Sequence, residues 1–160
     1  MSSPQSSDKQ TNFIAEFTRI YNQINTVLEQ LEPGTVIHPG SGWRVHDLLG
    51  HLAVWYQQRI NVLKAYQRGE DYQIPGFEMD KFNHSAADER KDRPFADIHT
   101  EWQHAHRNLI AQLKAIPADR YDDEVMYPWG ARGPIGLLLE RLIEHGDEHY
   151  AEFVGAAAKT

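Results

Sequence analysis

The sequence predicts an all-α protein, a four-helix bundle around a single core. Three observations lead to this prediction. Four segments carry apolar residues at intervals of three and four, the spacing of helices with one buried face. Proline and glycine separate these segments, and no stretch alternates apolar and polar residues as a strand does. A chain of 160 residues suffices for one well-filled core, so we expect a single domain over residues 9–158.

The N-terminal eight residues are rich in serine and other polar residues. Residues 1–8 lack the basic and apolar stretches of a signal peptide, so we expect a disordered tail on a cytoplasmic protein. The first helix is predicted from Lys9 to Leu31, and Pro33 and Gly34 end it. Its apolar stripe comprises Phe13, Phe17, Ile20, Ile24, Val27, Leu28 and Leu31.

The second helix is predicted from near Trp43 to about Gln67, with Gly69 closing it. Ser41 is the nearest residue that can cap its N-terminus. Its inward face comprises Val45, Leu48, Leu52, Trp55 and Leu63. His51 lies at the edge of this stripe.

The remaining chain predicts two loops and three further helical segments. A loop over residues 71–76 leads into a short helical piece over residues 77–89. A strong helix begins at Pro94 and ends at Pro117, and a second loop spans residues 119–133. The last helix runs from Pro134 to about Val154. Because the connection between the second and third long helices is long, the helices need not simply alternate in direction.

Composition narrows the possible functions. The formal net charge of −7 argues against a nucleic-acid partner, which would require clustered basic residues. No apolar run approaches the ~20 residues of a membrane span. The chain has no cysteine, so any bound metal must be held by nitrogen and oxygen. Nine histidines are many for this length and direct attention to a metal site.

Two of these histidines occupy the apolar stripe of the last helix. That stripe comprises Ile135, Leu138, Leu142, His145, His149 and Phe153. His145 and His149 are four residues apart, so their imidazoles lie on one face and must find partners inside the protein. His51, on a different helix, is the natural third ligand, because metal sites in bundles use facing helices. Three imidazoles with an open fourth position would form a catalytic type of site.

A plainer interpretation stays open, in which each histidine bonds a carboxylate or a backbone carbonyl. Glu152 lies three residues after His149 and can orient its imidazole. Trp43, Asn83 and Trp129 are candidates to line the substrate side. The histidines of the third long helix lie off its apolar stripe, so we expect them to be exposed: His99, His104 and His106.

Several stretches resemble a known superfamily. Residues 43–52 have the sequence WRVHDLLGHL, which is similar to the W-S-x-x-D/E-L-L-x-H-L opening of the second helix in the DinB/YfiT-like superfamily. His145 and His149 resemble the histidine pair of its last helix. The stretches PGF (75–77), FN (82–83) and RPF (93–95) resemble the ClbS/DfsB-like branch and the related N-terminal domains of mycothiol-dependent maleylpyruvate isomerases.

The resemblance implies a four-helix bundle of the DinB/YfiT-like type, often a homodimer, in which His51, His145 and His149 bind zinc or nickel. Members include transferases that use a low-molecular-weight thiol and a hydrolase that opens an electrophilic cyclopropane. The ClbS-like branch tends to end in His-Tyr-x-Glu-His, whereas Phe153 replaces the final histidine here.

We therefore expect a metal-dependent enzyme that activates a small thiol or water against an electrophilic small molecule. Thiol transfer is favoured over hydrolysis because it is the superfamily's best-understood chemistry. The alternatives are a ClbS-like self-protection hydrolase and a non-enzymatic, stress-related protein that binds a metal or ligand. A purely structural helical adaptor is a third possibility, which predicts ordinary hydrogen bonds for the histidines.

Overall fold

The computed structural model describes residues 4–159, with side chains from Asp8 onward. The described residues form five helices and four short strands in the order α1, β1, β2, α2, α3, α4, β3, β4, α5. The helices are α1 (Pro4–Leu28), α2 (Val45–Gln67), α3 (Met79–Arg90), α4 (Phe95–Ala115) and α5 (Ile135–Ala158). The strands are β1 (Val36–His38), β2 (Trp43–Arg44), β3 (Glu124–Met126) and β4 (Arg132–Pro134).

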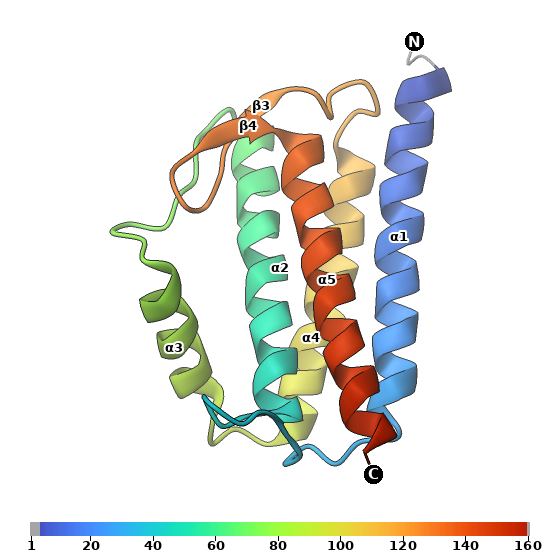
Figure 1. The fold of residues 1–160 in the computed structure, drawn as a ribbon. Helices are drawn as coiled ribbons and strands as arrows, with labels where there is room; N and C mark the ends of the chain where they lie inside the picture. The colour runs from blue at the N-terminus through green and yellow to red at the C-terminus, as the bar shows by residue number, and fades with distance from the viewer. Residues whose placement is uncertain (1–3, 160) are drawn as a thin grey trace.

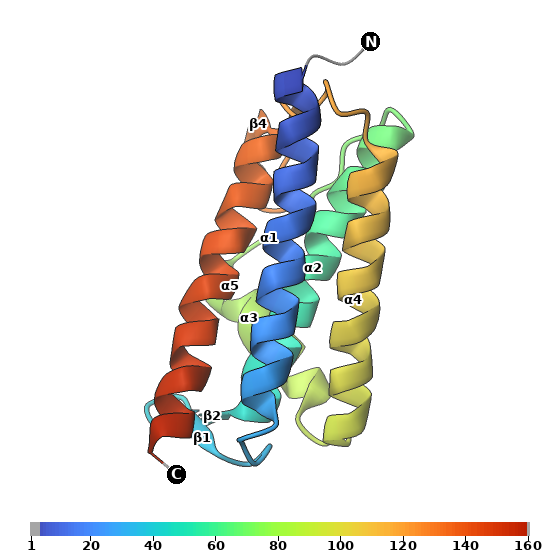
Figure 2. The same ribbon diagram turned by 90° about the vertical axis from the view of Figure 1, so that its right-hand side faces the viewer.

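The four long helices, α1, α2, α4 and α5, form the bundle, and α3 lies outside it beside α2 (Figure 1). Figures 1 and 2 show α1 and α5 running in one direction, while α2 and α4 run in the other. The connection between α2 and α4, which contains α3, therefore returns to the end of the bundle at which α2 begins, so α4 runs in the same direction as α2 (Figure 1). This arrangement confirms the predicted fold class, and the long connection has the effect on topology that its length suggested.

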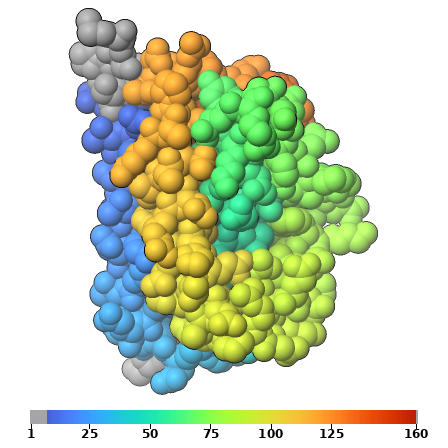
Figure 3. All heavy atoms as spheres, turned by 180° about the vertical axis from the view of Figure 1, so that it is seen from behind, coloured from blue at the N-terminus to red at the C-terminus, as the bar shows by residue number. Residues whose placement is uncertain are grey.

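The predicted apolar stripes meet in the middle of the bundle. Residues from all four long helices are fully buried there, among them Phe17, Leu52, Trp102 and Leu142. Burial of these stripes supplies the main stabilising free energy of the fold. Seen from behind, α1, α4 and the upper part of α2 form a continuous surface, and the segment around α3 stands out at one side (Figure 3). None of the described helices has the length and apolar character required to cross a membrane.

Some predicted helix boundaries require correction. The predicted tail of residues 1–8 lies partly outside the described residues, and α1 already begins at Pro4. Ser41 does not cap α2, because the cap is Arg44, whose backbone N–H donates to Asp47 Oδ2 at 2.9 Å. The Arg44 guanidinium also donates to the Asp47 carboxylate, so one carboxylate accepts hydrogen bonds from both the backbone and the side chain of Arg44. The negative charge at this position also suits the helix dipole.

Two hairpins occupy segments outside the predicted helices, although the sequence shows no alternation there. The first lies between the first two predicted helices, and the second coincides with the predicted loop over residues 119–133. β1 pairs antiparallel with β2 and brings His38 opposite Trp43, and Gly42, with φ of 76°, allows the turn between them. β3 pairs antiparallel with β4, and Trp129 lies in the loop that joins them. Strands of two or three residues are too short to produce a periodic pattern, which explains why the sequence did not predict them.

His106 on α4 is buried, so the prediction that it is exposed was wrong. Its side chain is 9% exposed and stacks on Tyr21 with ring centroids 4.0 Å apart. Its Nδ1 has no hydrogen-bond partner among the described residues. Burial lowers the pKa of His106 to about 4, so the ring is neutral at physiological pH. The neighbouring His104 is exposed as predicted, whereas His99 is half-buried and contacts Asn25.

Replacing His106 with phenylalanine is expected to reduce the loss of stability in acid. In the unfolded chain histidine takes up a proton near pH 6.5, while the folded protein resists protonation of His106 until about pH 4. The free energy of unfolding must therefore fall as the pH drops between these values, by up to ~3 kcal/mol from this group. Phenylalanine keeps the stacking on Tyr21 and does not titrate. Urea denaturation of both proteins at several pH values tests this, and identical pH profiles would contradict it.

Candidate metal centre

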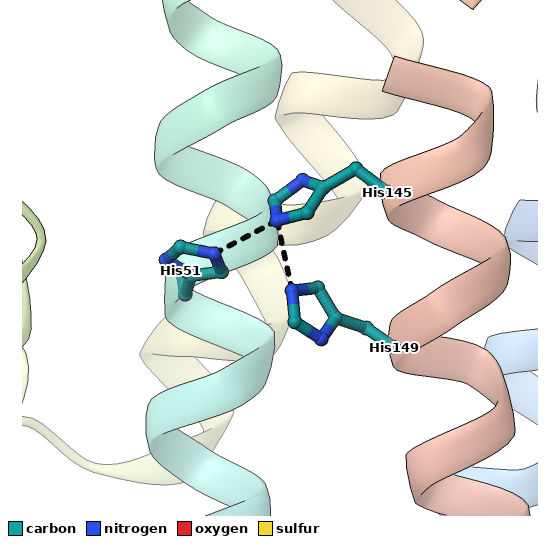
Figure 4. A group of neighbouring side chains, drawn as sticks. All are labelled: His51, His145 and His149. Atoms are coloured by element: carbon teal, nitrogen blue, oxygen red, sulfur yellow. Dashed lines mark hydrogen bonds between the residues drawn. The ribbon is translucent and has the colours of Figure 1, made fainter. Parts of the chain in front are cut away.

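Three imidazoles from two helices converge inside the bundle (Figure 4). His51 lies on α2, while His145 and His149 lie one turn apart on α5, which packs against α2. The Nε2 atom of His145 is 2.9 Å from Nε2 of His51 and 2.8 Å from Nε2 of His149. The three nitrogens lie within 4.8 Å of one another, so together they can hold a metal ion.

Glu152 fixes the orientation of one of these imidazoles. Its Oε1 lies 2.6 Å from His149 Nδ1, and its Oε2 contacts His38 Nε2. Burial alone would raise the pKa of Glu152, but hydrogen bonds from His38 and His149 outweigh that effect and lower it. The carboxylate is therefore ionised, and the proton of the His149 ring resides on Nδ1. The His149 Nε2 lone pair consequently points toward the other two histidines.

Burial keeps all three converging imidazoles neutral. Burial, with a smaller contribution from the neighbouring His149, lowers the pKa of His51 to about 3 and that of His145 to about 2. The pKa of His149 is also lowered, chiefly by burial, although its bond to Glu152 opposes the shift. Neutral imidazole is the form that binds a metal ion.

The contacts among these nitrogens suit a metal ion better than hydrogen bonding. His149 Nε2 carries no proton, so its contact with His145 requires a proton on His145 Nε2. The proton on His145 Nε2 cannot point at both His149 Nε2 and His51 Nε2. A proton on His51 Nε2 would point directly at the proton on His145 Nε2. One of the two contacts is therefore always unsatisfied in neutral rings. A divalent cation would accept all three lone pairs at once.

A cavity of about 700 Å³ lies beside the histidine triad, which we define as His51, His145 and His149. The three predicted substrate-side residues, Trp43, Asn83 and Trp129, all line it. The Trp43 ring lies 5.2 Å from the ring of His51. Asn83 Oδ1 accepts a hydrogen bond of 2.8 Å from Trp55 Nε1, which ties α3 to α2. The Ile74 N–H donates to Pro128 O at 2.8 Å and joins the loop before α3 to the β3–β4 hairpin, which carries Trp129.

Sequence reasoning missed six other residues that line the cavity: His38, Trp55, Arg59, Phe77, Met79 and Arg141. The sequence offers no reason to assign His38 a ligand role, and its spacing predicts Trp55 to be a core residue. Trp55 is 3% exposed, so it belongs to the core and also lines the cavity. Arg59 is 5% exposed, and its guanidinium lies 5.4 Å and 5.2 Å from the ring centroids of Trp55 and Trp129. Arg141 lies 5.9 Å from the Trp129 ring.

The signal that identified the α5 histidines also applies to the two arginines. Residues four apart on a helix share a face. The cavity-facing residues follow this spacing on both helices: His51, Trp55 and Arg59 on α2, and Arg141, His145 and His149 on α5. The spacing of Arg59 and Arg141 from the triad histidines could therefore have identified both arginines from the sequence as facing the same site. The role of His38 had no such signal, because only the hairpin and α5 together bring it to Glu152.

The sequence matches the family described as "Mycothiol maleylpyruvate isomerase N-terminal domain" over residues 38–146. The match covers more than half of the 160 residues. The chain belongs to this family. The matched segment contains His51 and His145, and His149 follows three residues beyond it. No curated protein sequence matches the chain significantly.

Solved structures share the fold of this family member. A mycothiol-dependent maleylpyruvate isomerase superposes with a TM-score of 0.74 at 13% identity, over 90% of this chain and 60% of that protein. The chain thus spans about three fifths of the isomerase's length. The colibactin self-resistance protein ClbS, solved in complex with double-stranded DNA, gives 0.75 at 14% identity, over 91% of this chain and 93% of ClbS. YfiT from Bacillus subtilis is described as a probable metal-dependent hydrolase with an unusual four-helix bundle topology. It superposes with a TM-score of 0.77 at 14% identity, over 99% of this chain and 90% of YfiT.

These comparisons confirm the predicted resemblance to the DinB/YfiT-like superfamily. At such low identities the structural likeness establishes the fold alone. Within that fold, this family member has a histidine triad that can hold a metal ion beside a cavity of small-molecule size.

Proposed function

We propose that this protein is a metal-dependent enzyme that directs a small thiol, or water, at an electrophilic small molecule. His51, His145 and His149 are the metal ligands in this proposal, with zinc or nickel as the metal. The observation that carries it is the convergence of three Nε2 atoms within 4.8 Å of one another beside an open cavity. A divalent cation bound there supplies Lewis acidity, which makes a coordinated thiol or water nucleophilic at neutral pH.

The protein's own side chains orient the metal ligands and position the substrate. Glu152 holds the His149 ring through Nδ1, and His38 holds Glu152 from the β1–β2 hairpin. Trp43 and Trp129 line the cavity and keep a bound substrate against the triad. The new bond forms between the sulfur or oxygen of the nucleophile and an electrophilic carbon of the substrate. The nucleophile's proton passes to the leaving group or to the atom that gains the electron pair.

Thiol transfer is the form of the proposal that we favour. The family is named for a mycothiol-dependent isomerase, and one structural neighbour is such an enzyme. Hydrolysis is the second form, and it has support from the description of YfiT as a probable hydrolase. The expected homodimer, the cytoplasmic location and the absence of a nucleic-acid partner stay predictions, and the ClbS structure with DNA makes the last of these worth testing.

A turnover assay tests the proposal. The protein is purified without a His-tag or metal column, stripped with a chelator, and reloaded with zinc or nickel. Loss of 1-chloro-2,4-dinitrobenzene is followed with cysteine, glutathione or mycothiol, and an activated ester is used without thiol to detect hydrolysis. We expect metal-dependent turnover that is lost in His51→Ala and retained in His104→Ala, whose histidine is exposed on α4.

The possible outcomes separate the candidate functions. Turnover only with a thiol supports the transferase, and turnover without thiol supports the hydrolase. Stoichiometric metal without turnover above the metal-free control would contradict catalysis on these substrates and favour a binding protein. A protein that takes up no metal would remove the basis of the whole proposal.

A further inference from the structure

Within the part of the chain that the structure describes, Arg59 is a buried cation without an anionic partner. Its side chain is 5% exposed, and among the described residues it forms no ion pair and no hydrogen bond. Its Nε atom is fully enclosed without an acceptor. Burial, with a smaller contribution from the neighbouring Arg141, lowers the pKa of Arg59 to about 10, yet the group stays charged at neutral pH. A buried charge without a partner is costly and therefore calls for a functional explanation.

The surroundings of Arg59 place its guanidinium at the cavity. The group lies 5.4 Å from the centroid of Trp55 and 5.2 Å from that of Trp129, so two aromatic rings hold it. Both rings line the same cavity as the histidine triad, and none of the described residues that line it is acidic. Arg141 contributes a second positive charge from α5. The described lining of the cavity therefore combines two cations and largely apolar walls with no counter-charge.

We propose that Arg59, assisted by Arg141, binds a carboxylate group of the substrate. A guanidinium presents its N–H donors in a planar fork that matches a carboxylate, and a ligand carboxylate would supply the missing acceptors and counter-charge. Because the substrate is assumed to react at the triad, this inference rests on the proposed function. It adds the chemical class of the substrate, which is a small carboxylate with an apolar body that fits between tryptophan rings.

The helix geometry also indicates the size of this substrate. Arg59 lies eight residues from His51 along α2, which corresponds to roughly 12 Å of helix rise. Arg141 lies four residues from His145 along α5, or roughly 6 Å. The two helices run in opposite directions, so both arginines lie on the same side of the triad (Figure 1). We expect the carboxylate and the reacting atom to be separated by one to two helical turns.

A binding experiment on metal-free protein tests the carboxylate site separately from the metal. Benzoate is titrated against benzamide, its uncharged analogue, with tryptophan fluorescence and calorimetry as readouts. We expect saturable benzoate binding, little binding of benzamide, and at least tenfold weaker benzoate binding in Arg59→Met. Arg59→Lys, which keeps the charge without the fork, should also bind more weakly. Arg141→Met should lose less benzoate affinity than Arg59→Met. Arg107 is an exposed arginine on α4, so Arg107→Met should bind benzoate like the wild type.

The outcomes distinguish this inference from the proposed function. Equal benzoate affinity in wild type, Arg59→Met and Arg141→Met would overturn the carboxylate site, as would equal binding of benzamide. Arg59-dependent binding of inorganic phosphate without benzoate binding would also overturn it. Metal content is measured on the same variants and should be unchanged. If benzoate binds through Arg59 but no metal binds at the triad, the carboxylate site stands and the proposed metal enzyme fails.

Discussion

Replacing His145 with alanine is expected to abolish stoichiometric metal binding. His145 is the central member of the triad, because its Nε2 lies within 2.9 Å of both other Nε2 atoms. Removing it leaves one ligand on each helix and no shared contact between them. We expect affinity to fall at least a hundredfold, which is about 3 kcal/mol at 1.4 kcal/mol per factor of ten. Metal content by mass spectrometry and competition with a chromophoric chelator measure the loss.

Two further variants make this prediction quantitative. Glu152→Ala keeps all three ligands but releases His149 Nδ1, and the loss of such an orienting bond typically costs 10–100-fold in metal affinity. His104→Ala removes an exposed histidine from α4 and should change nothing. We therefore expect metal affinity to be highest in His104→Ala, lower in Glu152→Ala and lowest in His145→Ala. Retention of one metal per chain in His145→Ala would refute the assigned ligand set.

Replacing Trp102 with alanine is expected to cause the largest loss of stability. Trp102 on α4 is fully buried, lies 4.9 Å from the Tyr56 ring on α2 and 5.8 Å from the Tyr21 ring on α1, and donates its Nε1–H to Asn25 Oδ1 at 3.2 Å. Truncation leaves a cavity where three helices meet. A loss of ~3–5 kcal/mol is typical of such sites, which for this chain length lowers Tm by roughly 10 °C.

The metal site should survive this loss of stability. α4 carries none of the triad, so folded Trp102→Ala should still bind one metal ion per chain at a temperature well below its Tm. Trp43→Ala is the matched control, because Trp43 is half-buried at the cavity and its removal should lower Tm much less. Denaturation of the metal-free proteins by heat and urea measures the difference. A Tm within 2–3 °C of the wild type would show that Trp102 does not hold the helices together as its burial suggests.

Local patterns in the sequence were sufficient for most of the helices. Each apolar stripe depends on residues within one or two turns of each other, and proline and glycine mark where each stripe must stop. The same local pattern singled out His145 and His149, because histidine stood where leucine would be expected. The position of His51 near an inward stripe made it a candidate, although its distance from the pair could not be known.

Other features depend on contacts between segments that are far apart in the sequence. His38 meets Glu152 only because the β1–β2 hairpin closes against α5, and a two-residue strand leaves no periodic trace. His106 lies off the main stripe of α4, yet Tyr21 of α1 covers it. The cap of α2 likewise shifted from Ser41 to Arg44 and Asp47, because the hairpin extends the backbone up to the first turn.

The sequence by itself determined an all-α chain, the approximate extent of its helices and the three histidines that can serve as ligands. Only the tertiary structure decided that these histidines converge, that α2 and α4 run in the same direction, and that Arg59 lies buried between two tryptophans. The reason is physical. Helix periodicity is a property of neighbouring residues, whereas the direction, rotation and spacing of packed helices follow from the fit of whole faces and the lengths of their connections.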